Sequence, residues 1–171
     1  MEKSKKKNEN DQEVMVQFED FLSEVDENYK EFVTNIHESL LLNNYKFKIE
    51  SKASGLFVSY SHPKTKRSML NFLFRKNGLF VRIYADNVDK YVDFLNGLPE
   101  KMEKEIEKAP VCKRLINPDD CNPKCITGYD FYVRDKHYQK CRYSCFQFAV
   151  NSDSILVLSD FIENERKERF W

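Results

Sequence analysis

The feature that most limits the possible folds is a run of strand-like segments joined by short turns between residues 45 and 84. Apolar and polar residues alternate in most of this run, as in strands with one buried face, and the third segment is apolar on both faces, as in a central strand. Asn77-Gly78 predicts a tight hairpin turn with positive φ angles. Short turns between strands favour an antiparallel sheet over the strands 45–49, 56–60, 68–74 and 79–84.

Segments with helical periodicity surround these strands. From Val14 to Leu41 the apolar residues recur at the 3.6-residue spacing of one long helix, or of two helices broken near Asp26, which could cap the second. The same reasoning predicts helices over 88–95, 99–108 and 155–162, and further strands between 129 and 150. We therefore expect an α+β fold: a mostly antiparallel sheet with N-terminal, middle and C-terminal helices packed on it, and a cysteine-bearing loop.

The chain length of 171 residues suits one domain. Residues 1–13 are charged and polar and predict a disordered tail, which leaves 14–171 as a single α+β domain. No apolar run approaches the roughly 18–20 residues that span a bilayer, and the N-terminus lacks a signal-peptide core. These features predict a cytoplasmic protein that does not enter membranes.

The net charge is zero, but every charged residue between 51 and 85 is basic. Aromatic residues are interleaved with these cations, a pattern found in proteins that bind single-stranded nucleic acid on an open sheet. The alternative is a basic sheet packed beside acidic helices, with the aromatic residues in the core. If the surface binds an anion or nucleic acid, the predicted contacts are Lys64, Lys66, Arg67, Arg75, Lys76 and Arg82.

All five cysteines fall between residues 112 and 145. The sequence Cys121-Asn122-Pro123-Lys124-Cys125 is a turn with two thiols at a spacing that suits a tetrahedral zinc ion. Cys145 is left out because it lies four residues beyond Cys141 in strand-like sequence, too far along the strand to share a ligand set. We predict a zinc site formed by Cys112, Cys121, Cys125 and Cys141, and a structural one, because four thiolates leave no open position for catalysis.

Three other interpretations of the cysteines remain open. His137 could replace one of the zinc ligands. The cysteines could instead be buried free thiols that act as small apolar residues. Finally, Cys121 and Cys125 could form a redox pair, because basic neighbours lower the pKa of a thiol.

Four stretches of this segment resemble a group of small, uncharacterised bacterial cytosolic proteins that carry a domain of unknown function. They are Cys112-Lys113-Arg114-Leu115, Cys121-Asn122-Pro123-Lys124-Cys125, Gly128-Tyr129-Asp130-Phe131 and Tyr138-Gln139-Lys140-Cys141-Arg142-Tyr143. The resemblance covers about residues 68–165. It implies that the segment is one structural unit, and it implies no activity.

These observations together predict a non-enzymatic binding or interaction module with a structural zinc-cysteine clasp. Its partner would be an anionic ligand, a nucleic acid or another protein. One alternative is an enzyme with its site in the segment 112–145, where Tyr129, Tyr132, Tyr138, Arg142 and Tyr143 gather. The other is a nucleic-acid-binding module that uses the basic strands 52–84. The histidines fit no Ser-His-Asp, metalloprotease or phosphate-loop spacing.

Overall fold

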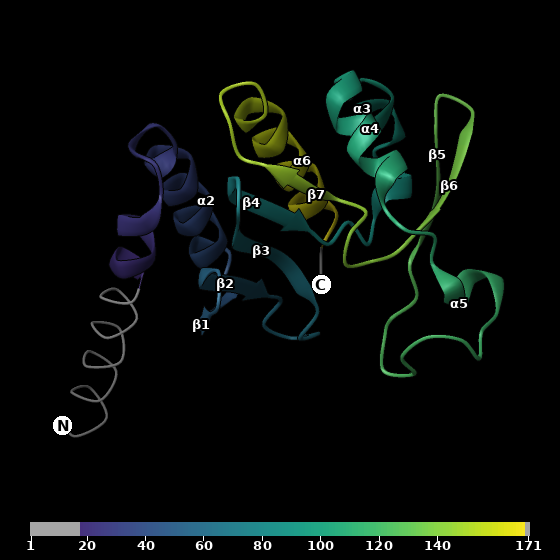
Figure 1. The fold of residues 1–171 in the computed structure, drawn as a ribbon, viewed down its shortest axis with the longest axis horizontal. Coiled ribbons are helices and arrows are strands. Elements are labelled where there is room, and N and C mark those ends of the chain that lie inside the picture. The colour runs from purple at the N-terminus through teal and green to yellow at the C-terminus, as the bar shows by residue number, and fades with distance from the viewer. Residues whose placement is uncertain (1–17, 170–171) are drawn as a thin grey trace.

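A computed structural model describes residues 18–169 of the chain and confirms the α+β class (Figure 1). The tail predicted over 1–13 lies outside the described residues. In the described part no helix is long and apolar enough to cross a membrane.

The N-terminal helical stretch is broken where the sequence predicted. A first helix covers 18–24, and the Asp26 carboxylate then accepts a hydrogen bond from the Asn28 backbone N–H at 2.9 Å. This cap starts a short 3₁₀ turn that leads directly into a long helix. The helical elements are η1 (Glu27–Tyr29), α2 (Lys30–Leu42), η2 (Val88–Lys90), α3 (Val92–Asn96), α4 (Glu100–Lys108), α5 (Lys113–Ile116) and α6 (Ile155–Glu168).

The strands form two antiparallel sheets. The larger sheet has five strands in the order β1-β2-β3-β4-β7, so that the predicted central strand is in its middle. β7 returns to this sheet after the cysteines and pairs with β4, as in Val81 with Phe148. β5 and β6 form a separate hairpin. The bounds are β1 (Lys46–Lys52), β2 (Gly55–Ser61), β3 (Ser68–Arg75), β4 (Gly78–Ile83), β5 (Tyr129–Val133), β6 (Lys136–Lys140) and β7 (Gln147–Ala149).

One face of the five-stranded sheet carries the core. Helix α2 packs on it through Phe32, whose ring centroid lies 6.3 Å from that of Phe72, and α6 packs on it through Phe161, 6.2 Å from Phe148. Figure 1 shows α2 and α6 on this side of the strands. The buried strand residues of this face are Val58, Tyr60, Leu70, Phe72, Leu79, Val81, Ile83 and Phe148. On the opposite side, α4 borders the β4–β7 end of the sheet, where Met102 and Glu105 line a pocket together with Phe80.

The predicted β3–β4 hairpin is present, but the backbone differs from the local patterns in two details. The β3–β4 hairpin pairs Arg75 with Gly78, so the turn residues are Lys76 and Asn77, and of these positions only Gly78 has a positive φ, at 116°. Asp86 or Asn87 could cap the helix predicted over 88–95, and Asn87 does precede η2, but its side chain forms no cap and instead donates to the Glu165 carboxylate at 3.1 Å. The strand pairing determines the turn in the hairpin, and the contact with Glu165 on α6 determines the position of the Asn87 side chain.

Candidate binding face and cysteine segment

The face of the sheet opposite α2 and α6 is polar across its middle. Residues directly opposite each other in neighbouring antiparallel strands share a face, so the pairings Lys48–Ser59, Ser59–Asn71, Asn71–Arg82 and Arg82–Gln147 define one continuous row. We call this side of the sheet the open face. Its polar row places one exposed and one half-buried cation, Lys48 and Arg82, among groups that can form hydrogen bonds.

Two half-buried aromatic rings lie beside this row. Phe57 and Phe80 are two residues along their strands from Ser59 and Arg82, and strand alternation therefore puts them on the open face. Leu73 lies between them on β3, paired with Phe80. The Lys52 ammonium group lies 5.5 Å from the centre of the Phe57 ring. The open face thus combines aromatic rings with cations.

Other aromatic residues proposed for such a surface belong to the core. Phe74 is on the helix-covered face, with its ring 5.6 Å from Phe21, and Phe72 is fully buried under α2. Tyr84 lies at the end of the open face and is covered by the cysteine segment, residues 112–145: the Arg142 guanidinium is 5.2 Å from its ring centre and the Tyr143 ring packs edge-on at 6.3 Å. Core packing therefore accounts for Phe72 and Phe74.

The basic residues singled out in the sequence fall into three places. Lys64, Lys66 and Arg67 precede β3, whereas Arg75 is its last residue and Lys76 follows it, so the two groups are separated by about 23 Å of extended strand. Arg82 lies between, on the open face, where its Nε and Nη2 donate to Gln147 Oε1 at 3.2 and 2.9 Å. No carboxylate of the described residues forms an ion pair with Arg82, Arg75 or Lys76.

A pair of lysines meets at one corner of the open face. Lys46, at the start of β1, lies beside Lys66 in the β2–β3 turn, and both are exposed. Contact with the Lys46 side chain lowers the pKa of Lys66, because two neighbouring ammonium groups repel each other. Neither lysine forms an ion pair with a described carboxylate. Two cations held together in this way attract an anion.

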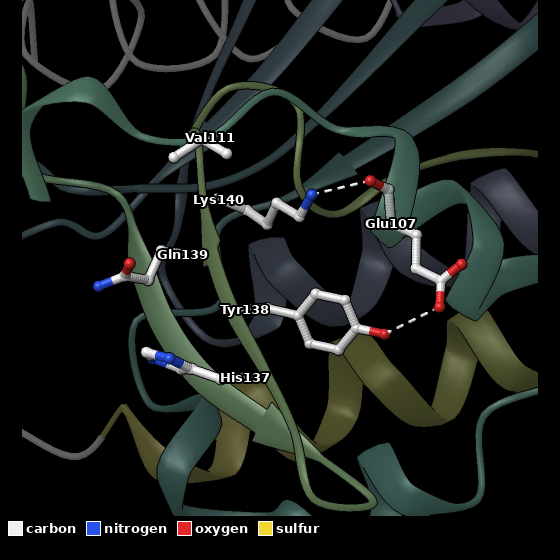
Figure 2. A pocket seen from close by; sticks show the side chains of 6 residues that line it. All are labelled: Glu107, Val111, His137, Tyr138, Gln139 and Lys140. Atoms are coloured by element: carbon white, nitrogen blue, oxygen red, sulfur yellow. Dashed lines mark hydrogen bonds between the residues drawn. The ribbon is translucent and has the colours of Figure 1, made fainter. Parts of the chain in front are cut away.

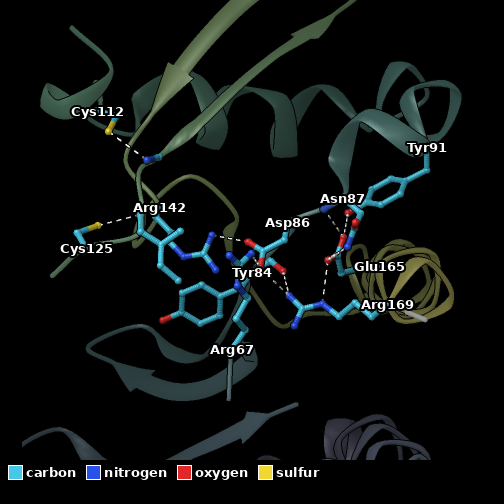
Figure 3. Close-up of polar contacts among 12 residues, drawn as sticks. Arg67, Tyr84, Asp86, Asn87, Tyr91, Cys112, Cys125, Arg142, Glu165 and Arg169 are labelled. Atoms are coloured by element: carbon cyan, nitrogen blue, oxygen red, sulfur yellow. Dashed lines mark hydrogen bonds and ion pairs between the residues drawn. The ribbon is translucent and has the colours of Figure 1, made fainter. Parts of the chain in front are cut away.

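Arg67 instead belongs to a buried ion cluster (Figure 3). Asp86, directly after β4, binds the Arg142 guanidinium and lies 3.6 Å from Arg67 and 3.5 Å from Arg169. Glu165, on α6, extends the cluster: it accepts hydrogen bonds from Arg169 Nε at 2.9 Å and from the Tyr91 hydroxyl at 2.6 Å.

The cluster fixes the position of the cysteine segment relative to the sheet. The side chains of Asp86, Glu165, Arg142 and Arg169 are all at least nine-tenths buried, so each charge depends on its partners. Burial by itself would lower the pKa of Arg142, but the hydrogen bond to Asp86 together with the charges of Asp86, Tyr129 and Tyr84 outweighs burial, and the pKa is raised. Arg142 therefore connects the segment after β6 to the end of β4 as a permanent cation.

The tyrosines and arginine considered for an enzyme do not converge on one cavity. Tyr129 and Arg142 are buried, with the guanidinium 5.5 Å from the Tyr129 ring, whereas Tyr132 and Tyr143 are exposed. Tyr138 borders a shallow cavity of about 330 Å³ between α4 and the β5–β6 hairpin (Figure 2). There its hydroxyl donates to Glu107 Oε1 at 3.3 Å.

The polar groups of this cavity bind one another. Lys140 Nζ donates to the Glu107 backbone carbonyl at 2.7 Å and so caps the end of α4. His137 stacks on Tyr132, with centroids 4.7 Å apart, and its Nε2 is 2.6 Å from Asp130 Oδ1. These contacts stabilise the hairpin, and they give no arrangement of a nucleophile with a base.

The cysteines differ in exposure. Cys112 is buried, and its Sγ accepts a hydrogen bond from the Gly128 backbone N–H at 3.3 Å. Cys125 and Cys141 are half-buried, and Cys121 is exposed. Cys145 is fully buried in the core, where burial raises the pKa of its thiol well above the ordinary value. In residues 18–169 no three His, Cys, Asp or Glu side chains are gathered as metal ligands, so zinc remains a prediction.

No family model, curated protein or solved structure matches this chain. The resemblance of the cysteine segment to small bacterial proteins therefore stays a prediction from sequence. Sequence reasoning also missed four residues of the open face: Lys46, Lys48, Phe57 and Asn71. The signal that could have found them is strand alternation relative to the buried Val58, which puts Phe57 and Ser59 together on the opposite face.

Proposed function

We propose that this chain is a non-enzymatic binding module that holds single-stranded nucleic acid on its open face. The observation that carries the proposal is the combination, on the sheet face opposite α2 and α6, of aromatic rings with cations that form no ion pair to a described carboxylate. The cations are Lys46, Lys66 and Arg82, and the rings are Phe57 and Phe80.

The aromatic rings and the cations can each bind a different part of single-stranded nucleic acid. Aromatic side chains stack on unpaired bases whatever their sequence, and cations beside them neutralise the backbone phosphates. Ser59 and Gln147 add hydrogen-bonding groups in the polar row. A double helix does not offer its base faces to a sheet, so we expect a preference for single strands.

The acidic residues of the molecule support this orientation. Glu50 is the acidic residue of β1 to β4, and it is engaged by Lys48 at 3.0 Å and Lys52 at 3.9 Å. By contrast, α2 and α6 carry exposed carboxylates that form no ion pair with a described cation, among them Glu31, Glu38 and Asp160. A polyanion is therefore attracted to the open face and repelled from the helical side.

A direct test is the affinity for a fluorescent single-stranded oligonucleotide, measured by anisotropy over a series of salt concentrations. The variant Lys46→Ala/Lys66→Ala removes the lysine pair. Because each phosphate contact on a single strand contributes about 0.7 to the slope of log K against log salt, losing both should reduce this slope by about 1.4. Affinity at low salt should fall about tenfold or more.

The matched control is Lys30→Ala/Lys167→Ala. It removes the same charge from α2 and α6, where the half-buried Lys30 pairs with Glu27 and the exposed Lys167 lies 3.8 Å from Glu163. The control should bind almost as the original protein does. Equal losses in the two variants, or no binding by the original protein at low salt, would refute the proposal.

A further inference from the structure

Two of the cysteines are held across one β-bridge. Val111 pairs with Lys140, the Cys112 N–H donates to Gln139 O at 3.0 Å, and the Cys141 N–H donates to Pro110 O at 2.8 Å. Cys112 and Cys141 are thus diagonal neighbours on the same face of this bridge, on opposite sides of the Val111–Lys140 pair.

This placement suits a shared metal ion better than a disulfide. Diagonal residues have Cα atoms about 7–8 Å apart. A disulfide needs Cα atoms closer than about 7 Å, with side chains aimed at each other. Two sulfurs on one tetrahedral zinc ion are each about 2.3 Å from the metal and nearly 4 Å from each other, which side chains at this diagonal can reach.

The sulfur of Cys112 is held by a backbone hydrogen bond: the Gly128 N–H donates to Cys112 Sγ at 3.3 Å. Position 128 has to be glycine for this approach, because an added Cβ would lie 2.7 Å from Cys112 Sγ and 2.3 Å from the Lys140 carbonyl oxygen. Hydrogen bonds of this kind orient the ligands of a metal site.

The turn 121–125 brings the other two thiols to the same region. The Cys125 N–H donates to Asn122 O at 3.0 Å, and the Arg114 guanidinium binds the Cys125 carbonyl, which ties the turn to α5. Cys121 adopts a left-handed backbone, with φ at 68°, at the start of this turn. Gly128, three residues after this turn, lies against Cys112 Sγ, so the chain leaving the turn reaches the Cys112 side of the bridge.

We propose that Cys112, Cys121, Cys125 and Cys141 bind one structural zinc ion, and that Cys145 does not take part. No three of these sulfurs lie at metal-ligand distance in the described residues. Binding therefore requires the turn 121–125 to approach the Cys112–Cys141 pair. Each thiol loses its proton to solvent as its sulfur bonds to the metal.

The basic residues around the site suit its charge. Four thiolates and one Zn²⁺ carry a net charge of −2, and the basic residues Lys113, Arg114 and Lys124 lie next to the proposed ligands in the sequence. Four sulfur ligands complete the tetrahedron, so the ion has no open position for a substrate or water. Its role is to fix the loop that borders Tyr84 at the end of the open face.

The test is the zinc content of the full chain, purified without chelator or nickel and then dialysed against zinc, with circular dichroism as a check on folding. The original protein should hold about one zinc per chain. Cys125→Ser and Cys141→Ser should hold much less. The matched control Cys145→Ala changes a cysteine of the same segment outside the proposed set and should keep the full zinc content.

A second variant keeps the test decisive if Cys141→Ser fails to fold. Cys121 is exposed, so Cys121→Ser should leave the core intact, yet it should lower zinc affinity and reduce the melting temperature gained on adding zinc. An original protein without zinc would overturn the proposal. So would full zinc content in both Cys121→Ser and Cys125→Ser, or a loss in Cys145→Ala equal to theirs.

Discussion

His37 on α2 should make the fold sensitive to mild acid. Its side chain is 3% exposed, its ring is stacked on Phe18 at 3.6 Å, and its Nδ1 is 2.7 Å from the Tyr60 hydroxyl. Burial lowers the pKa of His37 from 6.5 to about 4, because no described carboxylate forms an ion pair with its charged form.

The sign follows from proton linkage. Between pH 6.5 and about 4 the unfolded chain binds a proton at His37 that the folded chain does not, so the free energy of unfolding falls as the pH falls through this window. At about 1.36 kcal/mol for each pKa unit, the loss at the acidic end is about 3 kcal/mol. Above pH 6.5 the histidine should have no effect on the pH dependence.

Urea unfolding followed by circular dichroism between pH 7.5 and about 4.5 measures this loss. His37→Gln keeps a hydrogen-bonding side chain but cannot titrate, so its stability should depend less steeply on pH than that of the original protein. His137→Gln is the matched control, because His137 is an exposed histidine, and it should keep the original slope. Parallel curves for the original protein and His37→Gln would refute the reasoning.

Two further predictions concern stability, and urea unfolding at pH 7 measures both. Glu165→Gln should cost about 3 kcal/mol, since it leaves the fully buried Arg169 without its closest carboxylate, whereas Glu163→Gln, on the exposed side of α6, should cost less than about 1 kcal/mol. Gly128→Ala should cost at least about 1 kcal/mol because of backbone overlap, whereas Gly97→Ala, with no atom closer than 3.5 Å, should be nearly neutral. Equal losses of stability in Glu165→Gln and Glu163→Gln would contradict the importance of the buried Glu165–Arg169 ion pair. Equal losses in Gly128→Ala and Gly97→Ala would contradict the close packing around Gly128.

Local patterns were sufficient for most of the fold. The alternation over β1 to β4, the break at Asp26 and the stripe of α6 each depend on neighbours within a few residues, and each was predicted from the sequence. The pairing of β7 with β4 was not predicted, because it joins segments more than 60 residues apart. The separation of β5 and β6 into their own hairpin likewise depends on packing against α3 and α4.

The candidate surface was predicted only in part. The basic, acid-free stretch 51–85 does contribute to the open face, but composition does not say which side of a strand a residue occupies. Arg67 lies 3.6 Å from Asp86, with which it forms an ion pair, and Arg75 lies at the opposite end of β3 from Lys66. Lys46, from outside the stretch, completes the lysine pair because β1 lies beside β2. Such relations appear only when the strands are placed in register.

The central claim is that the open face binds single-stranded nucleic acid, and backbone amide NMR spectra during titration with an oligonucleotide test it most directly. If the open face binds the oligonucleotide, shifts should concentrate at Phe57, Ser59, Phe80 and Arg82 and around the lysine pair. Amides of α2 and α6 should stay unchanged. Shifts confined to the helical side, or no shifts at low salt, would contradict the claim.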